Sequence, residues 1–358
     1  MNKHLHQNWP VNQLFILLST VLVSLVILRY ASALLVPFLV ALAIAIVLSP
    51  LFKSLERRRI PRVISLVLVS AVPLTLFILL AAYISQEVSD LAANIGNMKN
   101  QLDAAMDGFA RRLSGIGLSV TPGQMEHALA QVNISGLVQQ LVARAGNQFS
   151  NLFLIFFTAA FILMETDYFF AKLQKIMEDR GQDMSEFIAF IDRIKAYFLL
   201  KVKTSLITGL WVLAVLWFHD IPYAVLWATL AFFLNFIPVI GSILAAIPPI
   251  VVAFLDQSLV TALWVTAWYL VINTVIGNIL EPHIMGRGLG LSALVIFLSM
   301  TFWGWIFGPA GMILSVPLTM GLQFLFSRYE ETRWIAFLLS DYRPAPATLA
   351  SGQETNHG

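Results

Sequence analysis

Hydrophobic residues in this chain occur in long, nearly uninterrupted runs rather than in the spaced clusters of a water-soluble protein. The complete runs are residues 12–28, 34–48, 63–85, 151–164, 205–218 and 259–280. Most of them approach the ~20 residues that a helix needs to cross a bilayer. The pattern predicts an all-α polytopic membrane protein with about six full transmembrane helices.

Two further apolar stretches, residues 223–255 and 291–326, are interrupted by helix-breaking residues. Asn235, Pro238 and Gly241 interrupt the first stretch, and Gly308 and Pro309 interrupt the second. Each arm of the first stretch would span about 20 Å as a helix, less than the ~30 Å hydrocarbon core. Paired interruptions of this kind indicate a transporter binding site. We expect two re-entrant helical hairpins of opposite orientation; the alternative is pairs of short spans, with up to ten crossings in all.

Polar residues lie between the two interrupted stretches. Asn273 and Asn278 occur near the end of an apolar run, Glu281 follows it, and Arg287 stands among glycines. Polar groups are costly in hydrocarbon unless they are paired, hydrated or used. With Asn235, Pro238, Gly241, Gly308 and Pro309, these four residues are the candidate substrate-binding and transport residues. The alternatives are that the asparagines only bridge helices and that Glu281 and Arg287 form an interfacial ion pair.

The segments outside the apolar runs predict the membrane topology. Residues 51–62 are strongly basic and are therefore expected in the cytoplasm. Residues 86–150 have an ordinary soluble composition and are expected outside, with apolar residues from Leu91 onward at steps of three and four and further helices near 121–122 and 134–142. This insert is either a cap on its own membrane domain or an oligomer contact. Residues 168–203 are expected as helices along the cytoplasmic interface, and Arg29 and Tyr30 as a tight turn between two spans.

The same pattern divides the chain into five parts. They are N-terminal transmembrane helices (1–85), an extracytoplasmic helical insert (86–150), a transmembrane helix with interfacial helices (151–204), a transport domain with broken helices (205–330), and a partly disordered cytoplasmic tail (331–358).

Composition excludes several other classes of protein. Hydrophobic residues make up 58% of the chain and charged residues 12%, against roughly 25% charged in soluble domains. A net charge of +2 gives no support for a nucleic-acid partner, and the absence of cysteine excludes disulfides and thiolate metal sites. No Walker-type nucleotide loop is present, and His283 beside Glu281 has no further metal ligands at suitable spacing. We expect no cofactor, no metal and no enzymatic activity.

The type of polar residue inside the spans bears on the solute. Acidic residues fall at the ends of the predicted spans: Glu165, Asp167, Asp256 and Glu281. A cation–proton antiporter usually needs a carboxylate deep in the membrane. Amides and hydroxyls in the interior suit a small polyhydroxylated solute better than sodium. Glu281 remains a candidate coupling carboxylate if its helix sits deeper in the membrane.

Three motifs in order resemble the autoinducer-2 exporter family over nearly the whole chain. They are Asn235-Phe-Ile-Pro-Val-Ile-Gly241, the Glu281-Pro282 to Gly286-Arg287 run with Gly-Leu-Gly-Leu-Ser after it, and Gly308-Pro-Ala-Gly-Met with Val316-Pro-Leu318. Val239 and Ser242 depart from the aromatic and further proline that the broader family often has there.

The resemblance implies export of autoinducer-2 from the bacterial cytoplasm by an inner-membrane protein. It also implies a homo-oligomer, a pentamer, and we expect both termini in the cytoplasm. Other branches of the family are implicated in sodium–proton exchange, which is the alternative function; a membrane scaffold without transport is the second alternative. Our working hypothesis is that both hairpin tips meet residues 273–281 near mid-membrane and move as a unit across a fixed frame of the first spans.

Overall fold

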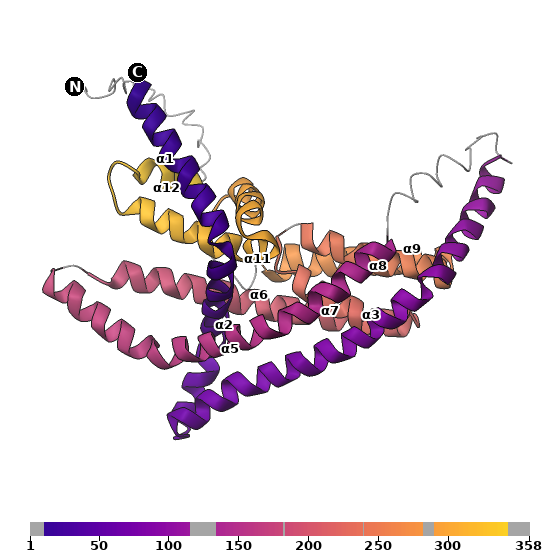
Figure 1. The fold of residues 1–358 in the computed structure, drawn as a ribbon, viewed down its shortest axis with the longest axis horizontal. Helices are drawn as coiled ribbons and strands as arrows, with labels where there is room; N and C mark the ends of the chain where they lie inside the picture. The colour runs from indigo at the N-terminus through magenta and orange to yellow at the C-terminus, as the bar shows by residue number, and fades with distance from the viewer. Residues whose placement is uncertain (1–10, 115–133, 182, 239, 282–289, 343–358) are drawn as a thin grey trace, which may run out of the picture.

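The computed structural model describes residues 11–114, 134–181, 183–238, 240–281 and 290–342. The described elements are all helical: α1 Val11–Tyr30, α2 Ser32–Arg57, α3 Arg62–Ser114, α5 Ile134–Asp179, α6 Ser185–Phe218, α7 Ala224–Leu234, α8 Ile240–Asp256, α9 Leu259–Asn273, the π-helix η1 Thr274–Leu280, α11 Ala293–Ser327 and α12 Arg333–Leu339 (Figure 1). Within these residues six helices, α11 among them, are long and apolar enough to cross a membrane by length and composition alone. The predicted fold class, an all-α polytopic membrane protein, is confirmed.

The first two helices do not form the expected hairpin. Figure 1 shows α1 continuing end to end into α2, across the direction of α3, α5 and α6. Ala31 keeps a right-handed helical conformation, and the amide groups of Ala31 and Leu35 donate to Ile27 and Ala31 across the junction. The predicted tight turn at Arg29 and Tyr30 is therefore wrong. No glycine or proline is present there to stop the helix, so its hydrogen bonds continue.

The segment expected outside the membrane is built as extensions of the spans. α3 runs unbroken for 53 residues and α5 for 46 residues, so each joins part of the predicted insert to a transmembrane segment. The helix expected near residue 134 is the first part of α5. The region around 121–122 and the apolar positions beyond Gly96 lie outside the residues whose side chains are described.

The first interrupted stretch forms a hairpin that enters and leaves at one end of α6. α7 and α8 are 11 and 17 residues long, about 16 and 25 Å, and each is shorter than a ~30 Å core. α7 starts just after α6 ends. After α8, the Gln257 side chain donates to the main-chain oxygens of His219 and Asp220 at 2.7 and 3.1 Å. The chain has thus returned to its point of entry.

The second interrupted stretch, α11, folds back on itself at Gly308. The indole of Trp303 donates to the Thr319 hydroxyl at 3.0 Å, although residues 16 positions apart on a straight helix would be about 24 Å apart. At the base of this hairpin Phe324 stacks on Phe190 of α6, with their ring centroids 4.5 Å apart. Arg328 forms an ion pair with Glu186, with 3.0 Å between the guanidinium nitrogen and the carboxylate oxygen. These α6 residues lie at the opposite end of the helix from the first hairpin. The two hairpins therefore have opposite orientations along α6, as predicted.

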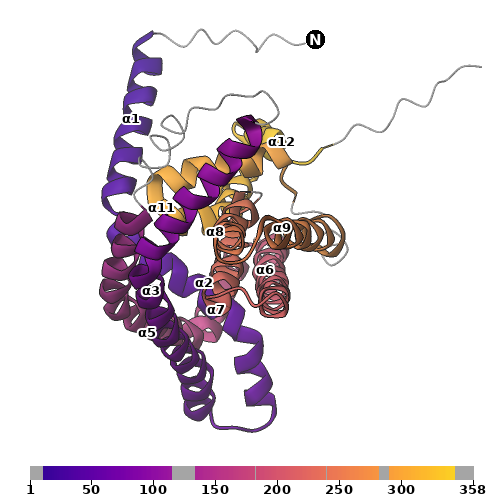
Figure 2. The same ribbon diagram turned by 90° about the vertical axis from the view of Figure 1, so that its right-hand side faces the viewer.

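Four apolar cores among the described residues hold these parts together. One joins α2, α3 and α5 through residues such as Ala41 and Ala159. A second joins the second half of α6 with α7, α8, α9 and η1 through residues such as Leu216 and Val265, and includes Leu91 of α3. A third packs α6 and α11 against α2, and a fourth packs α11 against α1 and α2. Figure 2 shows α6, α8 and α9 side by side and nearly end-on. This second core positions the polar centre described next.

Candidate functional site

A buried ion pair lies midway along α6, where the tip of the first hairpin and the end of η1 meet this helix. Lys201 Nζ lies 2.6 Å from Glu281 Oε1, and the two side chains are only 10% and 22% exposed. The same ammonium group lies 3.5 Å from the main-chain oxygen of Asn235. Removing two charges from water is costly, and their attraction repays that cost only with good geometry and further hydrogen bonds.

Hydroxyl and amide groups complete this centre. Thr204 donates to Glu281 Oε1 at 3.2 Å, and the side-chain amide of Asn235 donates to the Ser205 hydroxyl at 3.1 Å. The buried hydroxyl of Tyr197, on the same face of α6 as Lys201, has no hydrogen-bond partner among the described residues. An unpartnered buried hydroxyl usually marks a place for a water molecule or a bound group. The centre thus offers both a charge pair and free hydrogen-bonding capacity.

The α6 side of the centre was missed by the sequence analysis, which assigned residues up to 203 to the cytoplasmic interface. In the structure Lys201 is 8% exposed, and Thr204, Ser205 and Thr208 are buried with it. Tyr197, Lys201, Thr204 and Thr208 recur at steps of four and three, so they share one face of the helix. This polar stripe within an apolar helix was the sequence signal for a buried polar site. It was missed because Lys201, its charged residue, resembles an ordinary lysine at the membrane interface.

The π-helix η1 positions Glu281 against α6. The buried residues of α9 and η1 are Ala262, Val265, Tyr269, Ile272 and Ile276, at steps of three and four. Glu281, five positions beyond Ile276, contacts Lys201 of α6. A step of five matches the i→i+5 turn of a π-helix, a distortion frequent at functional sites. The wider turn therefore brings the carboxylate onto the buried face.

The two predicted asparagines lie on the other side of this segment. Asn273 is half-buried and Asn278 is exposed. Neither forms a side-chain hydrogen bond within the part of the chain that the structure describes, so the helix-bridging role is not seen here. Together with exposed Thr274 they form a polar strip on the surface of an otherwise apolar span.

The tip of the first hairpin is closed by direct backbone contact at Gly241. A Cβ atom placed on Gly241 would lie 1.8 Å from the main-chain oxygen of Leu234, so only glycine fits. Pro238, half-buried, accepts from the Ile240 amide at 2.7 Å within the same turn. Asn235, Pro238 and Gly241 thus belong to one compact tip, and Asn235 brings this tip to Lys201.

The second tip lies elsewhere. Gly308 has φ 65° and ψ −150°, a conformation that essentially only glycine adopts, and Pro309 beside it is exposed. The neighbouring Phe307 packs in a core with Leu28 of α1 and Leu35 of α2. Among the described residues no Cα atom of α11 lies within 8 Å of a Cα atom of α7 or α8. Only the first tip reaches Glu281, so the two tips do not meet as our working hypothesis expected.

Arg287 lies outside the described residues, so the expected pair with Glu281 is not described; the cation beside Glu281 in the structure is Lys201. Over the described ranges no three His, Asp or Glu side chains gather in a way that would hold a metal ion.

Short helical hairpins of opposite orientation, one of them with a polar centre at its tip, are typical of secondary transporters. The sequence pattern of the AI-2E family of transporters matches residues 14–331, and the chain belongs to this family. It is 38% identical to the AI-2 transport protein TqsA of Escherichia coli (strain K12) over 329 residues, 92% of this chain and 96% of the relative.

Two other relatives carry less specific names. A putative transport protein of Haemophilus influenzae is 34% identical over 94% of this chain and 99% of its own length. The putative transport protein YhhT of E. coli (strain K12) is 29% identical over 91% of this chain and 94% of its own length. All three are named as transport proteins, which agrees with the expectation of a transporter rather than an enzyme.

Proposed function

We propose that this protein exports autoinducer-2 from the cytoplasm across the inner membrane of a bacterium. The observation that carries the proposal is the 38% identity to a relative named an AI-2 transport protein, over 96% of that relative. A match of this extent includes both hairpins and the helices between them. The other two relatives are named only as putative transport proteins. Transport is therefore common to the family, whereas autoinducer-2 as the solute is our proposal.

The chemistry of the polar centre supports a small hydroxylated solute. Asn235, Thr204 and Ser205 supply neutral hydrogen-bonding groups beside the ion pair, and the Tyr197 hydroxyl has no partner among the described residues. The polar strip Asn273–Asn278 begins about two turns before Glu281. Because exposed amides are costly against lipid, we propose that this strip lines the path of the solute.

We further propose an elevator-like movement within a homo-oligomer, a pentamer as the family resemblance implies. The core of α2, α3 and α5 would be the fixed frame, and the core of α6 to η1 the moving unit. Each group has an apolar core of its own, which supports this proposal. The groups also pack together through Leu91 of α3 and through a core between α2 and α6, so the proposed movement must slide across these contacts. Light scattering or native mass spectrometry of the purified protein tests the subunit number, with five copies as the expected result.

A second candidate, sodium–proton antiport, is favoured by the position of Glu281. This carboxylate is mostly buried beside the middle of α6, whereas the sequence analysis expected it at the end of a span. A carboxylate inside the membrane is what proton coupling requires. A proton could be exchanged at Glu281 whether the transported species is autoinducer-2 or a cation, so transport assays must separate the two.

The deciding experiment is release of labelled autoinducer-2 from proteoliposomes, with and without an imposed proton gradient. Gradient-dependent release that is lost in Glu281→Gln, but kept in the exposed control Glu331→Gln, supports coupled export. Gradient-independent release lost in Asn273→Ala supports facilitated diffusion. Sodium exchange without autoinducer-2 release would establish the antiporter instead. If correctly inserted protein transports neither autoinducer-2 nor sodium, the result would favour a membrane scaffold without transport.

We also propose that both termini are cytoplasmic. Arg328 and Arg333, after the second hairpin, support this orientation for the C-terminus, and the basic residues 57–62 favour a cytoplasmic end of α2. Fusion of a periplasm-active and a cytoplasm-active reporter to each terminus tests it. Because α1 and α2 run end to end, a cytoplasmic N-terminus requires α1 to fold back along α2, so the N-terminal fusion is the more informative of the two. Periplasmic activity at either end would contradict this topology.

A further inference from the structure

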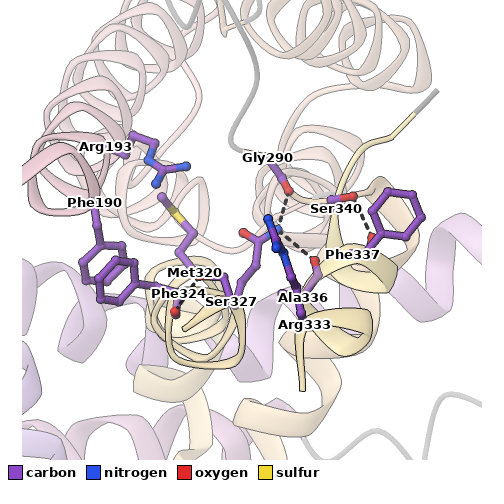
Figure 3. A pocket seen from close by; sticks show the side chains of 11 residues that line it. Phe190, Arg193, Gly290, Met320, Phe324, Ser327, Arg333, Ala336, Phe337 and Ser340 are labelled. Carbon is purple, nitrogen blue, oxygen red and sulfur yellow. Dashed lines mark hydrogen bonds between the residues drawn. The ribbon is translucent and has the colours of Figure 1, made fainter. Parts of the chain in front are cut away.

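A second polar site lies at the base of the second hairpin, about 12–16 Å along α6 from Lys201. Here a cavity of about 390 Å³ opens between α6, α11 and α12 (Figure 3). Phe190 and Phe324, stacked with their ring planes 12° apart, form one wall. The Gln323 side chain donates to the main-chain oxygens of Gly290 and Ala336 at 2.9 and 3.4 Å and so fixes α12 against the hairpin. The cavity is therefore built by defined contacts.

Two arginines from different helices line this cavity. Arg193 comes from α6 and Arg333 from α12, and Figure 3 shows them on different sides of the space. Neither forms an ion pair with a carboxylate in the described ranges, whereas nearby Arg328 pairs with Glu186 at 3.0 Å. Two unneutralised guanidinium groups at one cavity favour an anion. Their planar donor geometry suits the oxygens of a phosphate.

The surroundings indicate where this anion comes from. On α12, next to Arg333, the side chains of Trp334, Phe337 and Leu338 are 62%, 56% and 65% exposed. A short helix with aromatic and apolar residues exposed beside a cation is typical of the membrane interface. In the proposed topology this cavity lies between helices on the cytoplasmic side, where basic cavities are suited to lipid headgroups. The apolar wall of Phe190 and Phe324 would contact the part of the lipid next to its phosphate.

We infer that this cavity binds the phosphate group of an anionic phospholipid, with Arg193 and Arg333 as its ligands. The bound headgroup would connect α12 and the base of the second hairpin to α6. This site does not depend on which solute the protein transports.

The first test measures retention of phosphatidylglycerol and of phosphatidylcholine by native mass spectrometry of the full-length protein in detergent. The wild type is expected to retain phosphatidylglycerol preferentially. In Arg193→Gln/Arg333→Gln its affinity should fall about 30-fold, the equivalent of ~1 kcal/mol for each cation. The matched control is Lys175→Gln/Arg180→Gln, which removes two exposed charges from the same side of the protein. An equal loss in the control, or no lipid preference in the wild type, would overturn the inference.

A second measurement uses the unsubstituted protein and so does not depend on the folding of a variant. Photoactivatable phosphatidylglycerol should label peptides that contain Phe190, Phe324 or Arg333, and label found only elsewhere would overturn the site. Competition with inorganic phosphate distinguishes a lipid headgroup from soluble phosphate as the ligand of this cavity. If millimolar phosphate displaces the lipid label completely, the cavity is a site for soluble phosphate and the lipid assignment fails.

Discussion

The ammonium group of Lys201 lies 2.6 Å from the carboxylate of Glu281, although 80 residues separate them in sequence. The contact joins the middle of α6 to the end of η1. The main-chain oxygen of Asn235, 3.5 Å from the same ammonium group, connects the tip of the first hairpin to this pair. Each side chain is too buried to be fully solvated, so each depends on the other for neutralisation. The pair is therefore both part of the candidate site and a structural connection within the proposed moving unit.

Removing one partner of this pair should destabilise the protein more than removing both. Lys201→Gln leaves Glu281 without its cation and is expected to cost about 2–3 kcal/mol, somewhat less than for a fully buried pair because Glu281 retains some exposure. The double variant Lys201→Gln/Glu281→Gln should recover most of this loss. Thermal unfolding in detergent measures the effect. Strictly additive losses would show that the two charges are not coupled.

Gly241→Ala should disrupt the first hairpin tip, because the added methyl group would overlap the main-chain oxygen of Leu234. We expect normal membrane insertion, a lower unfolding temperature and loss of transport. The matched control is Gly96→Ala in α3, where a Cβ atom meets nothing within 4 Å. This control should be neutral or slightly stabilising, by about 0.5–1 kcal/mol. Full transport activity in Gly241→Ala would refute the assigned tip geometry.

Gly308→Ala tests a different physical requirement at the second tip. Its Cβ atom would have free space, but φ 65° with ψ −150° is strained for any other residue, at a cost of about 1–3 kcal/mol. Asparagine tolerates the ordinary left-handed helical conformation, which has a different ψ, so Gly308→Asn should not rescue the defect. Unfolding temperature and solute release are the measurements. Rescue by asparagine would indicate a different backbone at Gly308.

Cross-linking can test movement of the first hairpin against the frame. The Glu87 carboxylate of α3 accepts from the Leu226 amide of α7 at 2.7 Å. The chain contains no cysteine, so Glu87→Cys/Leu226→Cys creates a unique pair. Bridging it with a reducible bifunctional thiol reagent should stop transport, and reduction should restore it.

The control for this experiment bridges two helices of the frame. Lys53 of α2 and Asp167 of α5 form an ion pair at 3.7 Å, and the proposed mechanism leaves these helices fixed relative to each other. Bridged Lys53→Cys/Asp167→Cys protein should therefore remain active. Transport that persists with α3 bridged to α7 would exclude movement between those helices.

The hairpins could be predicted from sequence because their signals are local. Pro238, Gly241, Gly308 and Pro309 interrupt apolar runs that are otherwise helical, and the arms of the first run are too short to span. The error at Arg29 and Tyr30 has the same basis: a division between two apolar runs was interpreted as a turn although no residue there disfavours a helix.

The polar centre could be predicted only in part. Asn235 and Glu281 were identified because they interrupt or end apolar runs. Lys201 was missed because a lysine beside other charged residues is usually solvated, and its burial depends on a carboxylate 80 positions away. The π-turn of η1 was also unpredictable, since the choice between i→i+4 and i→i+5 hydrogen bonds follows from packing against α6.

The π-turn makes chain length, as well as residue type, a determinant of this site. Ile276 and Glu281 are five positions apart, a separation that suits the wider turn of the π-helix Thr274–Leu280. Each residue of an α-helix advances about 100° around its axis, so an α-helix of the same length would turn Glu281 away from Lys201. In this segment the number of residues and the type of helix are therefore matched: a change that made the helix regular without removing a residue would break the charge pair without altering either charged residue.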